Sequence, residues 1–379
     1  MRVLVAMSGG VDSSVAAALL VEEGHEVVGA TLKLWGGPSD SGCCSVADVE
    51  DARRVADQLG IVHHVFNLTE EFEQSVVEPY VASHAAGRTP NPCVECNRHI
   101  KFDRLLTRAV RLGHDVLATG HHARVRRGTG TPRLLRGVDA DKDQSYVLSM
   151  LSVAQLERVV LPVGEMTKAE VRSHARRLGL RTAGKPDSQD VCFIHGAEGR
   201  AGFLGRRLAL HDAAVVDRRT GATAGTLPAM ELVTVGQRRG IGRGDDGGRR
   251  YVVDVDVPAR RVVVGGEGDV RSGWVELDPA TVTWVDGPRL DGEEVVVQLS
   301  AHGAPVPGRL VQRADRVAVA LGSPQRLVAP GQTVALYDAS APEVVVGSAI
   351  ALRRSPAGAA ITPEERPGEA EVSPGDLVR

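Results

Sequence analysis

The N-terminal segment carries the residue pattern best suited to phosphate chemistry. A short apolar run at residues 3–7 leads into Ser-Gly-Gly-Val-Asp-Ser-Ser at residues 8–14. A glycine turn between a strand and a helix can present backbone N–H groups and the positive end of the helix dipole to a phosphate. The segment has neither the Gly-Lys-Ser/Thr ending of a Walker A loop nor the Gly-x-Gly-x-x-Gly of a dinucleotide site. We therefore expect a phosphate-binding loop of another type, the alternative being a turn that only connects a strand to a helix.

The cysteines form the second candidate chemical group, and there are five of them, at Cys43, Cys44, Cys93, Cys96 and Cys192. An odd and small number argues against a disulfide scaffold. Cys93 and Cys96 have the spacing of zinc ligands, but no second pair of ligands follows, so no zinc site is predicted. Cys93, Cys96 and Cys192 could instead hold an iron–sulfur cluster. In the remaining hypothesis one thiol carries a persulfide, and a second thiol attacks it and closes a disulfide. Cys43 and Cys44 are expected to be small core residues.

The surroundings of two cysteines favour the sulfur-transfer hypothesis. Cys96 is expected near the start of a helix that opens at about residue 98, where the helix dipole and Arg98 would favour a thiolate. A run rich in Gly, Pro and Asp precedes Cys192 and predicts a mobile loop.

Composition limits the class of protein. The 379 residues predict two or three domains, and 42% apolar with 25% charged residues is typical of a soluble globular protein. A formal charge of −3 excludes a histone-like polycation but permits a local basic face. No run of about 18–20 apolar residues and no secretory pattern is present, so we expect a cytoplasmic protein with no membrane partner. Lysine is scarce, at positions 33, 101, 142, 168 and 185, so a specific role is more readily expected where it occurs.

Two different hydrophobic patterns divide the chain. Residues 1–205 alternate strand-like and helix-like stretches, which predicts a parallel α/β sheet. Expected strands there are 3–7, 26–32, 61–66 and 115–119, and expected helices are 14–23, 46–59, 98–112 and 168–178. Later residues form short Val-rich runs between turns, the pattern of small antiparallel barrels or sandwiches. A break at Asp278-Pro279 separates residues 206–277 from 278–354, and the Pro-, Gly- and Glu-rich residues 355–379 predict a flexible tail.

The loop at residues 8–14 resembles the PP-loop of N-type ATP pyrophosphatases. Those enzymes split ATP into AMP and pyrophosphate and adenylate a substrate oxygen so that a nucleophile can displace it. The resemblance implies that Ser8, Ser13 and the loop amides hold the β and γ phosphates. Asp12 would hold Mg²⁺ or orient the α phosphate, since a carboxylate suits a hard cation.

Four further segments extend the resemblance along the chain. They are residues 89–102, 141–146, 184–194 around Cys192, and Gly-Gln-Arg-Arg-Gly at 236–240. With the loop, and in this order, they resemble the tRNA-specific 2-thiouridylase (MnmA) family over residues 1 to about 353. The fold implied is an α/β N-terminal domain with a parallel sheet, adenine nucleotide α-hydrolase-like, followed by mostly-β central and C-terminal β-barrel domains.

The resemblance also implies an activity and its residues. The wobble uridine of tRNAs for Lys, Glu and Gln would exchange its C2 oxygen for sulfur at the expense of ATP. A cysteine desulfurase or a sulfur-relay protein would donate the sulfur. Cys96 would be the nucleophile and Cys192 the persulfide carrier, with Asp12 also catalytic. Cys93 stands where some members have Asp, so it is not the essential thiol.

The remaining implied residues form two sets. The residues that would surround ATP are Ala6, Met7, Ser8, Gly9, Gly10, Val11, Asp12, Ser13, Leu32 and Gly120. Those that would contact tRNA are Asn91, Pro92, Cys93, His121, Lys142, Asp143, Gln144, Ser300, Ala301 and Gln332, the first three lining the pocket of the target base. Ser300-Ala301 replaces an Arg-aromatic pair of some relatives.

Basic residues and two competing functions complete the expectations. Nine Lys and Arg residues between 101 and 136, with 238–239 and 249–250, could form an RNA-binding face, a solvated surface being the alternative.

A different PP-loop enzyme, such as an amidotransferase-type synthetase or a tRNA lysidine synthase, would share the loop without needing both cysteines. A non-catalytic RNA-binding module is the third hypothesis.

Overall fold

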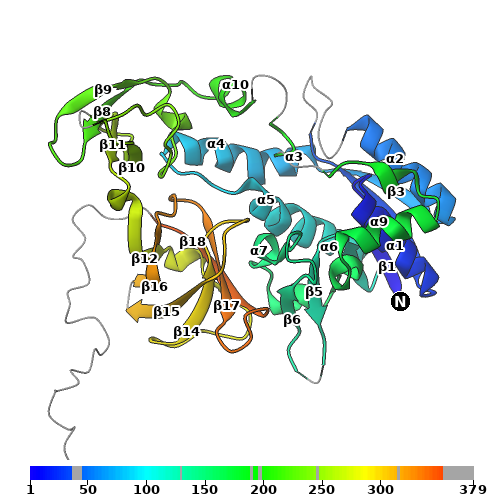
Figure 1. The fold of residues 1–379 in the computed structure, drawn as a ribbon. Coiled ribbons are helices and arrows are strands. Elements are labelled where there is room, and N and C mark those ends of the chain that lie inside the picture. Colours follow the sequence, from blue (N-terminus) through cyan, green and yellow to red (C-terminus); the bar gives the residue numbers. More distant parts are fainter. Residues whose placement is uncertain are drawn as a thin grey trace, which may run out of the picture.

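The computed structural model describes residues 1–35, 45–128, 130–187, 191–194, 199–244, 247–313 and 316–352. Cys43, Cys44 and the predicted tail at 355–379 lie outside the described residues. Within these ranges, no helix is long and apolar enough to cross a membrane. Figure 1 shows the N-terminal α/β part beside two β-rich parts, one built around β8–β11 and one around β12–β18.

The N-terminal sheet is parallel, as the alternation predicts. Its strand order is β3-β2-β1-β4-β7. The bounds are β1 Arg2–Ala6, β2 Glu26–Lys33, β3 Val62–Asn67, β4 Val116–Thr119 and β7 Val159–Val160. Val3 and Val5 of β1 are buried in one hydrophobic cluster and Leu4 in another, because successive side chains point to opposite faces. Both faces are therefore covered.

Different helices cover the two faces. The cluster around Val3 contains residues of α1 Val11–Glu22, α2 Val46–Leu59 and α9 Lys168–Arg177. The cluster around Leu4 contains residues of the segments that follow β3 and precede β4. Those segments are α3 Thr69–Phe72, the π-helical turns Glu73–Val77, α4 Glu78–Ala85, α5 Pro92–Glu95, the π-helical η2 Cys96–Leu105 and α6 Leu106–Arg111. Other helical segments are α7 Ser145–Leu148, α8 Val153–Leu156 and α10 Gly199–Gly205, with 3₁₀ turns at Pro162–Glu165, Arg181–Gly184, Met230–Leu232, Gly268–Val270 and Pro279–Thr281.

The central sheet is mixed rather than purely antiparallel. Its strands are β8 Ala213–Asp217, β9 Thr223–Leu227, β10 Tyr251–Asp256 and β11 Arg261–Gly265, in the order β10-β11-β8-β9. β8 lies parallel to β11, while its pairing with β9 and that of β10 with β11 are antiparallel. The antiparallel expectation is therefore wrong for this pair. β9 and β10 follow one another in the chain but lie at opposite edges of this sheet, a connection that strand alternation alone does not indicate.

The C-terminal sheet is antiparallel throughout and curls on itself. Its strand order is β12-β16-β15-β14-β17-β18-β13. The bounds are β12 Arg271–Leu277, β13 Thr283–Trp284, β14 Glu294–Gln298, β15 Val306–Arg313, β16 Arg316–Arg326, β17 Thr333–Asp338 and β18 Val345–Ile350. An isolated bridge joins Leu277 of β12 to Ala351, directly after β18, and so brings the two ends of the sheet together. A small hairpin, β5 Ala123–Arg126 with β6 Arg133–Arg136, reaches this sheet through a bridge from Leu135 to Val344.

Arg136 joins the N-terminal part to the C-terminal sheet. Its guanidinium donates to Asp143 at 2.8 Å and to Gln298 at 2.8 Å, and its carbon lies 3.7 Å from the ring centre of Tyr337. Burial raises the pKa of Tyr337 to about 12, which keeps its hydroxyl protonated. A charged hydrogen-bond network across a junction is costly to break, because each remaining partner would be buried alone. This network therefore helps to set the position of the C-terminal sheet relative to the N-terminal part.

His84 joins the N-terminal part to the central one, and its contact makes stability depend on pH. Nδ1 of His84 lies 3.0 Å from the backbone oxygen of Glu231, and the side chain is 1% exposed. Burial lowers the pKa of His84 to about 4. The unfolded chain takes up this proton near pH 6.5, whereas the folded chain resists it until about pH 4, so stability falls as the pH falls through that window. The full difference corresponds to about 3 kcal/mol, and about 2 kcal/mol of it is lost by pH 5.

We expect His84→Gln to flatten this pH dependence. Urea unfolding at pH 7.5 and pH 5 should show a smaller drop in the free energy of unfolding for the variant than for the natural chain, by about 2 kcal/mol. The exposed His302 offers a matched control. If His84→Gln and His302→Gln lose stability in parallel with the natural chain, this account of His84 is wrong.

Candidate active site

The loop between β1 and α1 lies where parallel α/β sheets bind ligands. β1 is flanked by β2 and β4, and the order of strands changes direction between β1 and β4. Carboxyl ends of strands at such a switch point form the usual ligand crevice. Gly10 is the N-cap of α1 and provides no side-chain hydrogen bond, so the first amides of the helix remain available to a ligand.

Two glycines allow backbone to pack tightly around this loop. Gly9 has φ of +70°, and a Cβ there would lie 2.3 Å from the backbone oxygen of Asp48. A Cβ at Gly120, directly after β4, would lie 2.5 Å from the backbone nitrogen of Ser13. The hydroxyl of Ser13 accepts a hydrogen bond from the backbone N–H of Ser8 at 3.1 Å. The loop is thus held in shape by its own residues, with its amides and hydroxyls gathered at the start of α1.

Asp12 lies in the first turn of α1 and is neutralised by two partners. Nζ of Lys168 lies 2.8 and 2.7 Å from its two carboxylate oxygens, and Nε2 of His122 lies 3.1 Å from one of them. Burial alone would raise the pKa of Asp12, but the hydrogen bonds from His122 and Lys168 outweigh it and lower the pKa below its ordinary value. Asp12 is therefore a fixed carboxylate beside the loop.

Lys168 also contacts a second carboxylate, that of Asp187. The distance from Nζ of Lys168 to Asp187 is 2.8 Å, and Lys142 and Arg172 lie 2.9 Å from the same side chain. Partial burial opposes ionisation of Asp187, yet hydrogen bonds from Lys168 and Lys142 lower its pKa to about 2. Asp187 therefore stays charged and anchors the start of the segment that leads to Cys192.

A third lysine fixes the loop itself. Nζ of Lys185 donates to the backbone oxygen of Gly9 at 3.0 Å and to Asp48 and Asp51 at 2.6 and 2.8 Å. Burial would lower the pKa of Lys185, but the two carboxylates outweigh it and raise the pKa. Sequence reasoning assigned no site role to Lys168, Lys185, Asp187 or His122. The scarcity of lysine was the one signal that could have found two of them.

The helix that carries Cys96 begins earlier than predicted. α5 starts at Pro92 with Asn91 as its N-cap, whose side chain accepts from the amide of Cys93 at 3.1 Å. Asn before Pro is a strong start signal, because it caps the helix and Pro needs no amide partner. Cys96 therefore lies beyond the first turn, where the dipole is weak, and Arg98 forms an ion pair with Glu95 at 3.4 Å. The predicted helix start at about residue 98 is therefore wrong, and Cys96 lies farther from the helix N-terminus than the sequence-based argument for a thiolate assumes.

The two principal cysteines share one hydrophobic cluster. Cys96 is 8% exposed within it, and the partly exposed Cys192 packs against it, as does Ala6 at the end of β1. Leu32 of β2 belongs to the same cluster. Cys93 is exposed. In the described part of the chain, no three His, Cys, Asp or Glu side chains are grouped so as to hold a metal ion.

Phe193 anchors the residue next to Cys192. It is 3% exposed, and its ring centre lies 5.1 Å from that of Phe203, 5.4 Å from Tyr80 and 5.7 Å from Phe72. The chain has only five phenylalanines, and three of them meet here. Edge-to-face aromatic contacts stabilise such a cluster beyond simple burial. Residues 191–194, at the end of the run predicted to be mobile, are therefore packed against the core.

The other predicted site residues fall into three surroundings. Met7, Gly9, Val11, Ser13 and Leu32 are buried around the loop, Ala6, Gly10, Asp12 and Gly120 are partly exposed, and Ser8 is exposed. Asn91, Pro92 and Gln332 gather at one place, because the side-chain amide of Gln332 donates to the backbone oxygen of Thr89. Ser300 and Ala301 follow β14, with their backbone oxygens both 3.1 Å from the amide nitrogen of Gln298.

Three of the residues predicted to contact tRNA, Asp143, His121 and Gln144, are buried or hydrogen-bonded within the protein. Asp143 accepts hydrogen bonds from Arg136, Gly137 and Ser145, and its side chain is 7% exposed. His121 is 8% exposed, and burial lowers its pKa well below the ordinary value. Gln144 accepts from the backbone N–H of His122 at 2.8 Å, which orients the residue that holds Asp12.

Comparison with known proteins places the chain in a family. Residues 1–196 match the family described as tRNA methyl transferase HUP domain, and residues 276–351 match the aminomethyltransferase beta-barrel domain. The chain is 46% identical over 365 residues to the tRNA-specific 2-thiouridylase MnmA of Mycobacteroides abscessus, covering 93% of this chain and 100% of the relative. This chain belongs to the tRNA-specific 2-thiouridylase (MnmA) family.

Other members of the MnmA family match over the same length. The relative from Mycolicibacterium gilvum is 45% identical over 92% of this chain and 99% of its own, and that from Acidothermus cellulolyticus is 45% identical over 93% and 98%. The HUP match spans the parallel sheet with the loop and both Cys96 and Cys192, and the barrel match runs from the end of β12 through β18. The fold class expected from the sequence is confirmed, apart from the mixed pairing of the central sheet.

Proposed function

We propose that this chain catalyses the ATP-dependent 2-thiolation of the wobble uridine in tRNAs for Lys, Glu and Gln. Membership of the tRNA-specific 2-thiouridylase family supports the reaction class. The structural observation that carries the proposal is the common cluster of Cys96, Cys192 and the strand residues beside the loop. Two thiols packed in the same cluster as Ala6 and Leu32 are what sulfur transfer to an adenylated base requires, and a loop used only for nucleotide sensing would not need them.

The first step of the proposed reaction is adenylation. The C2 oxygen of uridine attacks the α phosphorus of ATP, and pyrophosphate leaves. Loop amides, Ser8, Ser13 and the N-terminus of α1 would stabilise the phosphate charge, since preorganised donors act strongly where charge develops. Asp12 would hold Mg²⁺ only in exchange for Lys168, which bonds both of its carboxylate oxygens, and Mg²⁺ would neutralise phosphate charge when bound. A Cβ at Gly9 or Gly120 would collide with neighbouring protein backbone. This close packing of backbone around the loop suits a nucleotide that lies against the loop amides.

The second step replaces oxygen by sulfur. Cys96 attacks the inner sulfur of a Cys192 persulfide, the sulfur–sulfur bond of the persulfide breaks, and its terminal sulfur attacks C2 of the adenylated uridine. AMP leaves with the former C2 oxygen, and Cys96 and Cys192 are left as a disulfide. An external thiol reductant then restores both thiols, and a cysteine desulfurase or relay protein reloads Cys192.

The target base would enter beside Asn91, Pro92 and Cys93. A base in an anticodon loop can be splayed out and read in a pocket, as single-stranded RNA bases usually are. Gln332 reaches this place from the barrel, and Lys142 and Ser300 are proposed outer contacts. We assign residues 1–205 to catalysis and 206–277 and 278–354 to a central unit and a tRNA-binding barrel. The reaction would take place in the cytoplasm, where tRNA and ATP occur together.

A reconstituted reaction tests the proposed function. Purified chain is incubated with unmodified glutamate tRNA, ATP, Mg²⁺, cysteine and a cysteine desulfurase, and the digested RNA is searched for 2-thiouridine by mass spectrometry. We expect 2-thiouridine only when ATP is present. If AMP and pyrophosphate form with no thiolated base, under conditions in which another 2-thiouridylase is active, a different PP-loop reaction replaces this one.

A further inference from the structure

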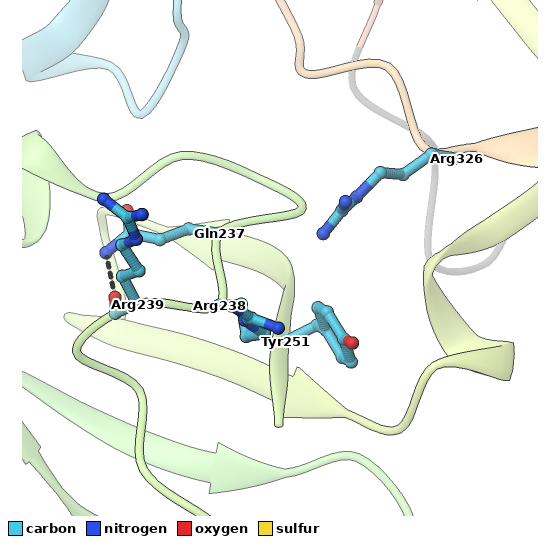
Figure 2. Close-up of a pocket in the computed structure, with 5 residues that line it drawn as sticks. All are labelled: Gln237, Arg238, Arg239, Tyr251 and Arg326. Carbon is cyan, nitrogen blue, oxygen red and sulfur yellow. Dashed lines mark hydrogen bonds between the residues drawn. The ribbon is translucent and has the colours of Figure 1, made fainter. Parts of the chain in front are cut away.

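An open pocket lies where the central sheet meets the C-terminal one. It has a volume of about 480 Å³ and is lined by Gln237, Arg238, Arg239, Tyr251 and Arg326. The first three belong to the turn before β10, Tyr251 begins β10, and Arg326 ends β16. Figure 2 shows Arg238 and Arg326 reaching toward the ring of Tyr251 from different segments. We call it the junction pocket; Arg238 and Arg239 were expected to extend an RNA-binding face, and none of the residues assigned to ATP, the target base or catalysis lines it.

The junction pocket is strongly basic. Within the described ranges, no carboxylate forms an ion pair with Arg238, Arg239 or Arg326. Other arginines of the same sheets are paired, as Arg250 is with Asp217 at 3.5 Å and Arg316 with Glu276 at 2.7 Å. Arg250, from the pair predicted to extend an RNA-binding face, is therefore a buried structural residue.

The pairing of β12 with β16 adds a further positive charge. Arg271 lies directly opposite Arg326 in the antiparallel register. Like charges opposite one another on neighbouring strands are destabilising. The side chains of Arg271 and Arg326 donate to backbone oxygens, of Pro324 at 3.4 Å and Gly236 at 2.7 Å, rather than to carboxylates. A bound anion would offset this repulsion.

The pocket is held in shape before any ligand arrives. Gly236, with φ of +84°, donates its N–H to the oxygen of Val252 at 2.8 Å, and Val252 donates back to Gln237 at 2.9 Å. The carbon of the Arg326 guanidinium lies 5.4 Å from the ring centre of Tyr251. A preorganised site loses less conformational freedom when it binds.

A short path links the pocket to the cysteine helix. Thr234, three residues before Gln237, lies 3.3 Å from Thr89 through their hydroxyl oxygens. The N–H of Thr89 donates to the oxygen of Pro330 at 2.7 Å, so three parts of the chain meet at this residue. Asn91, the cap of the helix that carries Cys96, follows two residues later. An extended polyanion lying over the cysteine helix could therefore continue to the junction pocket.

We propose that the junction pocket binds backbone phosphates of the tRNA, away from the target nucleotide. The inference rests on the proposed function, since it takes tRNA as the substrate. Arginine is well suited to phosphate, because its planar guanidinium donates two parallel hydrogen bonds. Contacts to phosphates position a nucleic acid without reading its sequence. The pocket thus fixes how tRNA lies across the three parts of the chain.

The test compares Arg238→Ala/Arg326→Ala with Arg219→Ala, which removes an exposed arginine from the β8–β9 turn of the same central sheet. Binding of glutamate tRNA is measured by filter retention from 50 to 200 mM salt. We expect the Kd of the double variant at 100 mM salt to rise at least tenfold. The slope of log Kd against log salt should fall by about 1 to 2, because each lost phosphate contact removes nearly one released counterion. Arg219→Ala should stay within twofold.

Four outcomes distinguish the possibilities. Equal weakening of a substrate tRNA and a tRNA that is not thiolated supports phosphate contacts, and weakening of the substrate tRNA alone overturns them in favour of base contacts. A double variant with unchanged Kd and slope overturns the pocket while leaving the proposed function intact. If the natural chain itself neither retains nor thiolates tRNA, the proposed function fails instead. Thiolation at saturating tRNA should keep its kcat in the double variant, with KM raised.

Discussion

Cys192→Ser is expected to lower the rate of 2-thiouridine formation by more than about 10³-fold, since a serine oxygen cannot carry a persulfide sulfur. Adenylation does not use this thiol, so tRNA-dependent pyrophosphate release in a single turnover should stay within about threefold of the natural chain. The variant should keep its fold, because Cys192 is only partly buried and Phe193 supplies the anchoring contacts. Quenched-flow sampling with nucleoside analysis measures both products.

Cys93 provides the matched control for this experiment. It is exposed, and its known role in the helix start is through its backbone amide, which donates to Asn91. Cys93→Ser removes a thiol that the proposed sulfur transfer does not use and keeps a small polar side chain beside the target base, so it should thiolate within about threefold of the natural chain, whereas Cys96→Ser should resemble Cys192→Ser. Retained thiolation in Cys192→Ser would contradict its role as persulfide carrier, whereas equal loss in Cys93→Ser would favour a cluster held by several cysteines.

Lys168→Met is expected to reduce adenylation by about 10²–10³-fold, the range found when one preorganised electrostatic group is removed. Nζ of Lys168 is the cation between Asp12 and Asp187, with distances of 2.7 and 2.8 Å. Without it, Asp12 would face the incoming phosphates with only His122 as a partner, and repulsion would weaken ATP binding. Pyrophosphate release at saturating tRNA, measured over a range of ATP concentrations, should show KM raised and kcat lowered.

Two further variants, Lys33→Met and Lys168→Arg, distinguish a loss of adenylation activity from a loss of folding stability. Lys33 is exposed at the end of β2, and Lys33→Met should leave adenylation within twofold. Removing one partner of a buried ion pair costs about 3–5 kcal/mol, so Lys168→Met should also unfold at lower urea. Lys168→Arg keeps the charge and should recover most of that stability while remaining slower than the natural chain, because the guanidinium cannot occupy the same point between two carboxylates. Full adenylation activity in a folded Lys168→Met would show that Lys168 has no positioning role.

Local pattern determined the order and type of most elements. The helix expected at 46–59 is Val46–Leu59, and the Thr167–Glu170 capping box opens α9 as its spacing predicts. Strand β17 at Thr333–Asp338 is one of the short strands expected in the later part of the chain, although its first five residues are all buried and show no alternation. These features depend on residues within a few positions of one another, so capping, periodicity and glycine stops are sufficient to find them. The motif order likewise located the loop and both principal cysteines.

Only the tertiary structure decided which charges meet. Lys168 reaches Asp12 across 156 residues, Lys185 reaches Gly9 across 176, and Arg326 reaches Gly236 across 90. Such pairs depend on strand order, register and the path of the connections, none of which is contained in local periodicity. The sequence alone does not distinguish an arginine that neutralises a buried carboxylate, as Arg136 does, from an exposed arginine such as Arg238. The motifs of the sequence therefore indicated the class of chemistry. The roles of Lys168 at Asp12 and of Lys185 at the loop, and the basic junction pocket, depend on contacts that exist only in the folded chain.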